Sequence, residues 1–322
     1  MTVEATTSSE RTSQNIRDAH DNAALAAAIR KLAKARQAIL LAHNYTRSEV
    51  QDVADFVGDS LELSRKAAAC RAPVIVFCGV RFMAETAKIL SPDSIVLHPR
   101  PDAGCPMADM ATPEAVADYR RAHPGVLTVA YVNTTAATKT EVDICCTSGN
   151  AEKLVSGLPA DREVIFLPDQ NLGANTAAKL GRKLNLWPGC CPTHNRILPK
   201  HIETARAAHP GAQVLVHPEC LPAVVELADQ ALSTGGMLKY VHAADAKEFI
   251  IGTESGLLHR LRLENPDKVF YPLKPDVCCP NMKKITLEDV LTSLCNMAPT
   301  VELDPDTIRR ARTPIDRMLA IG

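Results

Sequence analysis

The sequence is poor in features that mark several classes of protein. Aromatic residues make up only 4% of its 322 residues, and the 36 basic residues nearly balance the 37 acidic ones without forming a basic block. We therefore expect no nucleic-acid partner and no anionic membrane surface, because both require clustered positive charge. Stacking on single-stranded nucleic acid would also need more aromatic side chains.

Long apolar segments are missing as well. No uninterrupted apolar run reaches the roughly 18 residues that a membrane-spanning helix needs. The first twenty residues are polar and do not contain the apolar region of a secretory signal. We therefore expect a soluble, cytoplasmic protein without a membrane partner, preceded by a flexible N-terminal extension over residues 1–22.

The eleven cysteines include no Cys-x-x-Cys pair, which is the usual arrangement in structural zinc sites. In a chain without an export signal, cysteines are better interpreted as reduced thiols or metal ligands than as disulfide partners. The sequence does contain Cys-Pro three times, at positions 105, 191 and 279, in steps of 86 and 88 residues.

Other landmarks recur with nearly the same period. His-Pro-Gly precedes an apolar segment at 123–125 and at 209–211, and a hydroxyl residue follows an aspartate by five positions in three places. These aspartate–hydroxyl pairs are Asp55 with Ser60, Asp143 with Ser148 and Asp229 with Thr234. Because several landmarks keep one order and one spacing, the sequence predicts three tandem units. We place them at residues 23–123 with a leading helix, 124–209, and 210–322 with a C-terminal helix.

Each unit begins with a continuously apolar run, as in "QAILLAHNY", "VLTVAYVN" and "AQVLVHPE", which is typical of strands buried on both faces. Helical stretches alternate with strands, and the third strand of each unit leads to Cys-Pro. This alternation predicts an α/β fold of three αβα repeats with parallel sheets around a pseudo-threefold axis. Because ligands gather at the carboxyl ends of parallel strands, the three cysteines should meet at the centre.

Cys105, Cys191 and Cys279 are therefore the candidate metal ligands. Thiolates suit zinc or an iron–sulfur cluster, and three distant thiolates fit a [4Fe–4S] cluster with one iron left open as a Lewis acid. Cys190 and Cys278 could also reach a metal, but the shared proline favours their neighbours. The isolated cysteines are predicted to be small buried residues: Cys70, Cys78, Cys220 and Cys295.

Polar residues that follow the first strand of each unit are candidate catalytic or substrate-binding groups. They are His43, Tyr45, Tyr131, Asn133, His217 and Glu219. Ser60, Ser148 and Thr234 are expected at or near helix N-termini, as N-caps or as part of anion sites. Three such sites around one pocket would suit a substrate with several carboxylates or a phosphate. His194, three residues after Cys191, is a further substrate-binding candidate.

Taken together, these residues resemble the quinolinate synthase family from about residue 38 to residue 322. The stretches that carry the resemblance are "AHNY", "GDS", "FMAETAKIL", "GCPMADM", "AYVNT", "CTSGNAE", "GCCPTH", "HPEC", "STGGM", "GTESGLLHRL" and "CCPNMKKITLEDV". The resemblance implies an enzyme of NAD biosynthesis that condenses iminoaspartate with dihydroxyacetone phosphate, releasing phosphate and two waters to form quinolinate. It also implies a [4Fe–4S] cluster on Cys105, Cys191 and Cys279, with L-aspartate oxidase as a candidate partner.

The resemblance further implies a set of active-site residues that matches the polar candidates. Substrate binding would involve His43, Ser60, Tyr131, Asn133, Ser148, His194 and Thr234. We expect Glu219 to act as the general base, His217 to position it and Tyr45 to transfer protons. Two other functions remain open from the residues: an iron–sulfur hydro-lyase of another small acid, and a non-catalytic iron–sulfur sensor. A sensor would lack its usual basic DNA-binding surface here.

Overall fold

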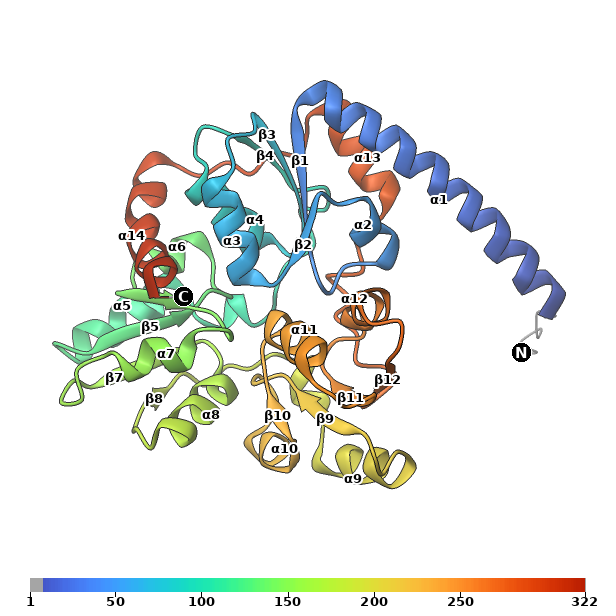
Figure 1. The fold of residues 1–322 in the computed structure, drawn as a ribbon. Helices are drawn as coiled ribbons and strands as arrows, with labels where there is room; N and C mark the ends of the chain where they lie inside the picture. The colour runs from blue at the N-terminus through green and yellow to red at the C-terminus, as the bar shows by residue number, and fades with distance from the viewer. Residues whose placement is uncertain (1–7, 322) are drawn as a thin grey trace, which may run out of the picture.

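The computed structural model describes residues 8–321 and contains three parallel four-stranded sheets flanked by helices (Figure 1). The strand orders are β2-β1-β3-β4, β6-β5-β7-β8 and β10-β9-β11-β12, so the three sheets have the same connectivity. Figure 1 shows the sheets grouped around a common centre. The predicted α/β fold of three repeated αβα units is confirmed.

The first two units have closely matching elements. The first comprises β1 (Ala38–His43), α2 (Ser48–Val53), β2 (Phe56–Gly58), α3 (Ser60–Ala69), β3 (Val74–Cys78), α4 (Arg81–Leu90), β4 (Ile95–Leu97), η1 (Ala108–Met110) and α5 (Pro113–Ala122). The second comprises β5 (Leu127–Tyr131), α6 (Ala136–Lys139), β6 (Ile144–Cys146), α7 (Ala151–Ser156), β7 (Val164–Leu167), α8 (Gln170–Leu180), β8 (Asn185–Leu186), η2 (His194–Arg196) and α9 (Pro199–Ala208).

The third unit repeats this order without the short 3-10 helix and ends with one additional helix, α14. It comprises β9 (Gln213–Val216), α10 (Pro222–Leu227), β10 (Gln230–Ala231), α11 (Thr234–Ala243), β11 (Glu248–Gly252), α12 (Leu257–Glu264), β12 (Val269–Pro272), α13 (Leu287–Asn296) and α14 (Pro305–Ile321). Within residues 8–321, none of the helices combines the length and the apolar character needed to span a membrane.

Each sheet has one strand more than the sequence predicted. The additional strands β2, β6 and β10 contain only two or three residues and pair with the first strand of their unit at the edge of the sheet. The strands β4 and β8 are equally short, but each leads to a Cys-Pro pair, whereas the additional strands lie within the aspartate–hydroxyl segments that were expected to open helices.

The repeated aspartate holds this edge together. In each unit its carboxylate accepts the backbone N–H of a residue in the first strand, and its own N–H donates to the carbonyl of that residue. The pairs are Asp55 with Leu40 at 2.8 Å, Asp143 with Thr128 at 2.9 Å and Asp229 with Val214 at 2.6 Å. The aspartate that revealed the repeat in the sequence therefore has a structural role just before the short strand.

The helix after each Cys-Pro pair packs on the next unit. Helix α5 contacts α6 of the second unit, and Ile202 of α9 lies in the core of the third sheet. Helix α13 packs on the first sheet, where Val290 and Leu294 share a core with Val74 and Val76. The ring of three units is thus closed by a segment near the C-terminus, and α14 packs against α4, α6 and β6. The proposed boundaries at 123 and 209 remain a prediction.

Two local expectations differ from the structure. Of the predicted N-terminal extension, residues 1–7 lie outside the described part of the chain, and the rest belongs to the long helix α1 (Ser8–Arg36), whose C-terminal part lies beside α13 (Figure 1). Among the isolated cysteines, Cys78 and Cys220 are buried and Cys70 is partly buried, whereas Cys295 is exposed. The prediction for Cys295 was wrong, because it lies on α13 outside the face that packs on the sheet.

Candidate active site

A cavity of about 140 Å³ lies where the three units meet. Its lining includes every residue predicted to form the site: His43, Tyr45, Ser60, Cys105, Tyr131, Asn133, Ser148, Cys191, His194, His217, Glu219, Thr234 and Cys279. The shared connectivity explains this convergence, because the loops after the first and the fourth strand of every unit lie at the same edge of its parallel sheet. The roles of these residues remain a prediction.

The three Cys-Pro turns have the same local construction. In each turn the carbonyl oxygen of the cysteine accepts the backbone N–H of the residue four positions later. The donors are Asp109 for Cys105 at 3.3 Å, Asn195 for Cys191 at 2.9 Å and Lys283 for Cys279 at 3.3 Å. Burial raises the pKa of Cys105 to about 12 and the pKa values of Cys191 and Cys279 above their usual range.

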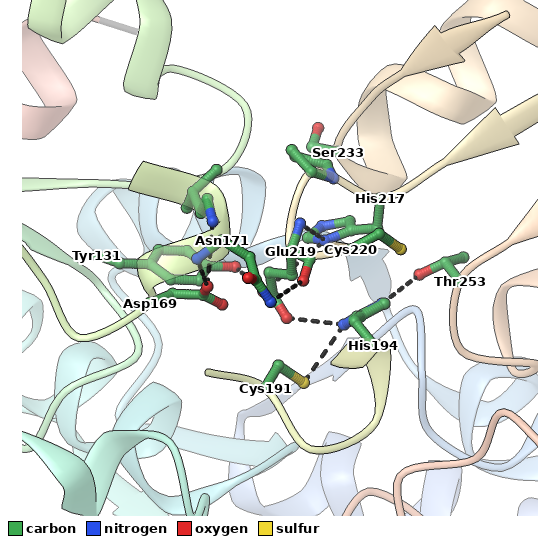
Figure 2. A network of polar contacts seen from close by, with 12 residues as sticks. Tyr131, Asp169, Asn171, Cys191, His194, His217, Glu219, Cys220, Ser233 and Thr253 are labelled. Carbon is green, nitrogen blue, oxygen red and sulfur yellow. Dashed lines mark hydrogen bonds and ion pairs between the residues drawn. The ribbon is translucent and has the colours of Figure 1, made fainter. Parts of the chain in front are cut away.

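A continuous chain of hydrogen bonds connects residues that line the cavity, and Figure 2 shows it from Tyr131 to Thr253. The hydroxyl of Tyr131 donates to Oε1 of Glu219 at 2.5 Å, and Oε2 of Glu219 lies 2.7 Å from Nδ1 of His194. On the other side of the imidazole, Nε2 of His194 lies 2.8 Å from Oγ1 of Thr253. That hydroxyl is 2.5 Å from the hydroxyl of Tyr45. Side chains from all three units are therefore connected through Glu219 and His194.

Thr253 is the one member of this chain that the sequence reasoning missed. It is buried and directly follows β11, the second long strand of its unit. The sequence-based candidates lie at the ends of the first and third predicted strands and at helix starts. Because all parallel strands of a sheet end at the same edge, the residue after the second strand was an equally good candidate.

Opposing effects act on the pKa values of the hydrogen-bonded residues. Burial disfavours the charged form of Glu219, but His194, His217 and the hydrogen bonds from His194 and Tyr131 outweigh it and keep the pKa of Glu219 below its usual range. Burial raises the pKa of Tyr45 and of Tyr131 well above the usual value. Glu219 is therefore a carboxylate held between the neutral phenol of Tyr131 and the imidazole of His194.

His217 does not contact the carboxylate of Glu219 by a hydrogen bond, since Nδ1 and Oε1 are 3.8 Å apart. Its Nδ1 instead accepts the backbone N–H of Glu219 at 3.3 Å, and His43 accepts the N–H of Tyr45 in the same way at 3.2 Å. An accepting Nδ1 places the proton of the neutral ring on Nε2. Burial lowers the pKa of His43 to about 4 and that of His217 to about 3, so both rings are neutral N–H donors at pH 7.

The three helix starts are less alike than the sequence suggested. The N-caps are Asp59, Asn150 and Ser233, so that Ser60 and Thr234 occupy the first helical position and Ser148 precedes α7 by three residues. In α3, the carboxylate of Asp59 already accepts two first-turn N–H groups. In α11, Ser233 accepts only that of Gly236 within the described residues. In α7, Asn150 makes no side-chain capping hydrogen bond, and beside α11 the Asp59 carboxylate accepts from the Ser233 hydroxyl at 3.2 Å, so the three helix starts offer an anion different surroundings.

The fold and the cavity together define a class of α/β protein in which three repeated units enclose one central site of thiols and polar side chains. Residues 27–320 match the family described as Quinolinate synthetase A protein, and the chain belongs to this family.

Curated relatives agree with this assignment. The chain is 55% identical over 293 residues to the quinolinate synthase of Geobacter metallireducens, covering 91% of this chain and 96% of the relative. It is 54% identical over 294 residues to that of Dehalococcoides mccartyi (91% and 97%), and 52% identical over 301 residues to that of Methanoregula boonei (94% and 99%). The family is one of enzymes in NAD biosynthesis, which decides against a non-catalytic sensor.

The residues present fit a metal group bound at the centre. Each unit contributes one thiol to the lining of the cavity, and thiolates are the usual ligands of iron–sulfur clusters. A second set of potential ligands overlaps this one: atoms of Cys191, His194 and Glu219 lie within 4.8 Å of one another. A metal bound to this second set would break the hydrogen bond between His194 and Glu219.

Proposed function

We propose that this chain catalyses the condensation of iminoaspartate with dihydroxyacetone phosphate, which yields quinolinate, phosphate and two waters. The observation that carries the proposal is the cavity in which one thiol from each unit faces the hydrogen-bonded chain from Tyr131 to Tyr45. L-aspartate oxidase is the proposed source of iminoaspartate.

The charges of these substrates suit the cavity. Both carboxylates of iminoaspartate and the phosphate of the sugar need N–H or O–H donors, because no lysine or arginine lines the cavity in residues 8–321. Donors are available from Nε2 of His43 and His217 and from the hydroxyls of Ser60, Ser148 and Thr234. The side-chain oxygen of Asn133 has no hydrogen-bond partner within these residues and can accept from a substrate amine or hydroxyl.

Cys105, Cys191 and Cys279 would hold a [4Fe–4S] cluster, which would supply an open iron as a Lewis acid for the oxygen that leaves as water. The remaining chemistry requires proton transfer by this chain's own residues.

Glu219 is the proposed general base, acting through the hydrogen-bonded chain. Tyr45 can give its hydroxyl proton to Thr253, and Thr253 can give its own proton to Nε2 of His194. The negative carboxylate of Glu219 then stabilises the positive charge on His194. Tyr131 holds the other carboxylate oxygen. The proposed task of His217 is to fix the backbone of Glu219 rather than its carboxylate.

The test is an anaerobic assay of the iron-loaded protein with the two named substrates, with quinolinate measured directly. We expect turnover by the wild type and a loss of about 100-fold or more for Glu219→Gln, because general-base catalysis is typically worth that much. Glu203→Gln, on the exposed face of α9, is the matched control and should keep wild-type activity. Turnover of a different small hydroxy acid, without quinolinate formation, would favour the hydro-lyase function instead.

A further inference from the structure

The three loops that follow the first strands share a feature beyond their polar side chains. In each loop, one side-chain N–H group from another element donates to two backbone carbonyls that flank a single residue. The flanked residue is Tyr45 in the first unit, Asn133 in the second and Glu219 in the third. All three line the cavity.

The contacts are short and consistent. Nε2 of Gln51 lies 3.1 Å from the carbonyl oxygen of Asn44 and 3.0 Å from that of Thr46. Nζ of Lys139 lies 2.7 Å from the carbonyl oxygen of Val132 and 2.5 Å from the carbonyl oxygen of Thr134. Nδ2 of Asn175 lies 2.9 Å from the carbonyl oxygens of both Pro218 and Cys220. In every case the two accepting residues are separated by the one whose side chain faces the cavity.

The donors themselves are not repeated in the sequence. Gln51 and Lys139 occupy matching places in α2 and α6, but one is an amide and the other an amine. Asn175 lies on α8 of the second unit and reaches across to the loop of the third. The same contact is thus made by three different side chains, two from the helix after the first strand of the same unit and one from a helix of the neighbouring unit. Common descent of the units does not by itself explain this recurrence, whereas a shared need to fix these loops does.

We propose that Gln51, Lys139 and Asn175 are positioning residues that clamp the backbone around Tyr45, Asn133 and Glu219. Bridging the carbonyls on both sides of one residue restricts the backbone dihedral angles between them and so fixes the direction of its side chain. The inference rests on the proposed function, because the three clamped residues are the ones expected to act on substrate.

Lys139 offers the sharpest test of this role. It is fully buried and its amine also lies over the ring of Phe82, 5.6 Å from the centroid. Burying an amine is costly, and burial lowers the pKa of Lys139 to about 8. Gln51 shows that a neutral amide can make the same two contacts. A glutamine at position 139 should therefore preserve the clamp, whereas a methionine of similar length should abolish it.

The experiment compares Lys139→Met and Lys139→Gln in the full-length, iron-loaded protein. We expect Lys139→Met to lower kcat about 10-fold or more, as a small misplacement of a reacting group does, with wild-type iron content. Lys139→Gln should recover most of the loss. Lys179→Met, at an exposed lysine of the same unit, is the control for removal of a positive charge and should behave as the wild type.

A second measurement keeps the proposal testable if Lys139→Met does not fold. Asn175→Leu removes the clamp in the third unit at a partly buried position, and it should lower kcat with little change in the KM values. Hydrogen exchange of the backbone around Asn133 and Glu219, measured on the protein without added substrate, should rise in the variant that lacks the local clamp.

The outcomes separate this inference from the proposed function. Wild-type kcat in a folded Lys139→Met or Asn175→Leu variant would overturn the clamp, as would equal losses for Lys139→Met and Lys139→Gln. A wild type that forms no quinolinate would refute the proposed function alone. In that case hydrogen exchange still tests the clamp. Unchanged exchange around Asn133 and Glu219 in the variants that lack the clamp would overturn the inference.

Discussion

At the scale of single residues, the hydroxyl of Thr253 is the link on which the proposed proton path depends. It is the only atom in the described residues that joins Tyr45 to His194. We expect Thr253→Val to lower kcat about 100-fold, within the range of lost acid–base catalysis, because the isosteric side chain cannot pass a proton. Thr253→Ser should keep most of the activity. Steady-state kinetics at equal iron content measures both, and wild-type kcat in Thr253→Val would rule out the path.

The two neutral histidines make acid stability a second prediction at this scale. The pKa of His43 is lowered from 6.5 to about 4 by burial, so between these values the unfolded chain binds a proton that the folded chain excludes. Stability is therefore fully present above pH 6.5 and is lost as the pH falls through 4. The shift corresponds to on the order of 3 kcal/mol for His43 alone, and His217 acts in the same direction.

Urea unfolding of the metal-free protein at several pH values between 7.5 and 4 measures this loss. His43→Gln removes the titrating group, and its unfolding free energy should fall less steeply over this range than that of the wild type. An identical pH dependence in both proteins would mean that His43 is already protonated, or exposed, in the folded state.

Most of the site residues could be predicted because they follow long, strongly apolar strands. Tyr45, Tyr131 and Glu219 stand in or just after such strands, and the parallel arrangement brings their ends together. Their partners were less predictable. Which side chain bonds to Glu219 depends on angles and distances between units, and the sequence favoured the neighbour His217 over His194 and Tyr131, which make the contacts.

At the scale of elements, the repeated aspartate should contribute directly to stability. In Asp229→Ala, the buried backbone N–H of Val214 loses its partner at 2.6 Å, and an unsatisfied buried donor costs about 1–3 kcal/mol. Asp229→Asn keeps an acceptor oxygen and should lose less. Urea unfolding at neutral pH compares the two, and equal stability of the alanine variant and the wild type would show that water replaces the carboxylate.

The sequence does not predict the edge strands of the sheets or the helix that closes the ring of three units. The strands β2, β6 and β10 are too short to have an apolar pattern, and they lie where the aspartate–hydroxyl pairs predicted helix starts. The helix α13 looks like any amphipathic C-terminal helix, and only tertiary packing decides that Val290 and Leu294 cover the first sheet rather than the third. Sequence order suggested a third unit with its own helix, whereas the structure uses that helix to join the two ends of the chain.

At the scale of the whole molecule, the three units meet at the thiols, and the cysteine doublets allow a stringent test. Cys191 and Cys279 line the cavity, whereas their neighbours Cys190 and Cys278 lie outside the lining. A cluster held at the centre should therefore depend on Cys105, Cys191 and Cys279, and not on the neighbours.

We expect anaerobically purified wild type to be brown, with about four irons per chain. Serine substitution of Cys105, Cys191 or Cys279 should remove most of the iron and the colour, whereas Cys190→Ser and Cys278→Ser should keep them. Loss of iron in Cys190→Ser with retention in Cys191→Ser would reverse the assignment in the second unit. Glu219→Gln distinguishes the overlapping ligand set: a metal on Cys191, His194 and Glu219 would be lost in this variant. A cluster on three thiols would remain, because Glu219 would then act on the substrate and not on the metal.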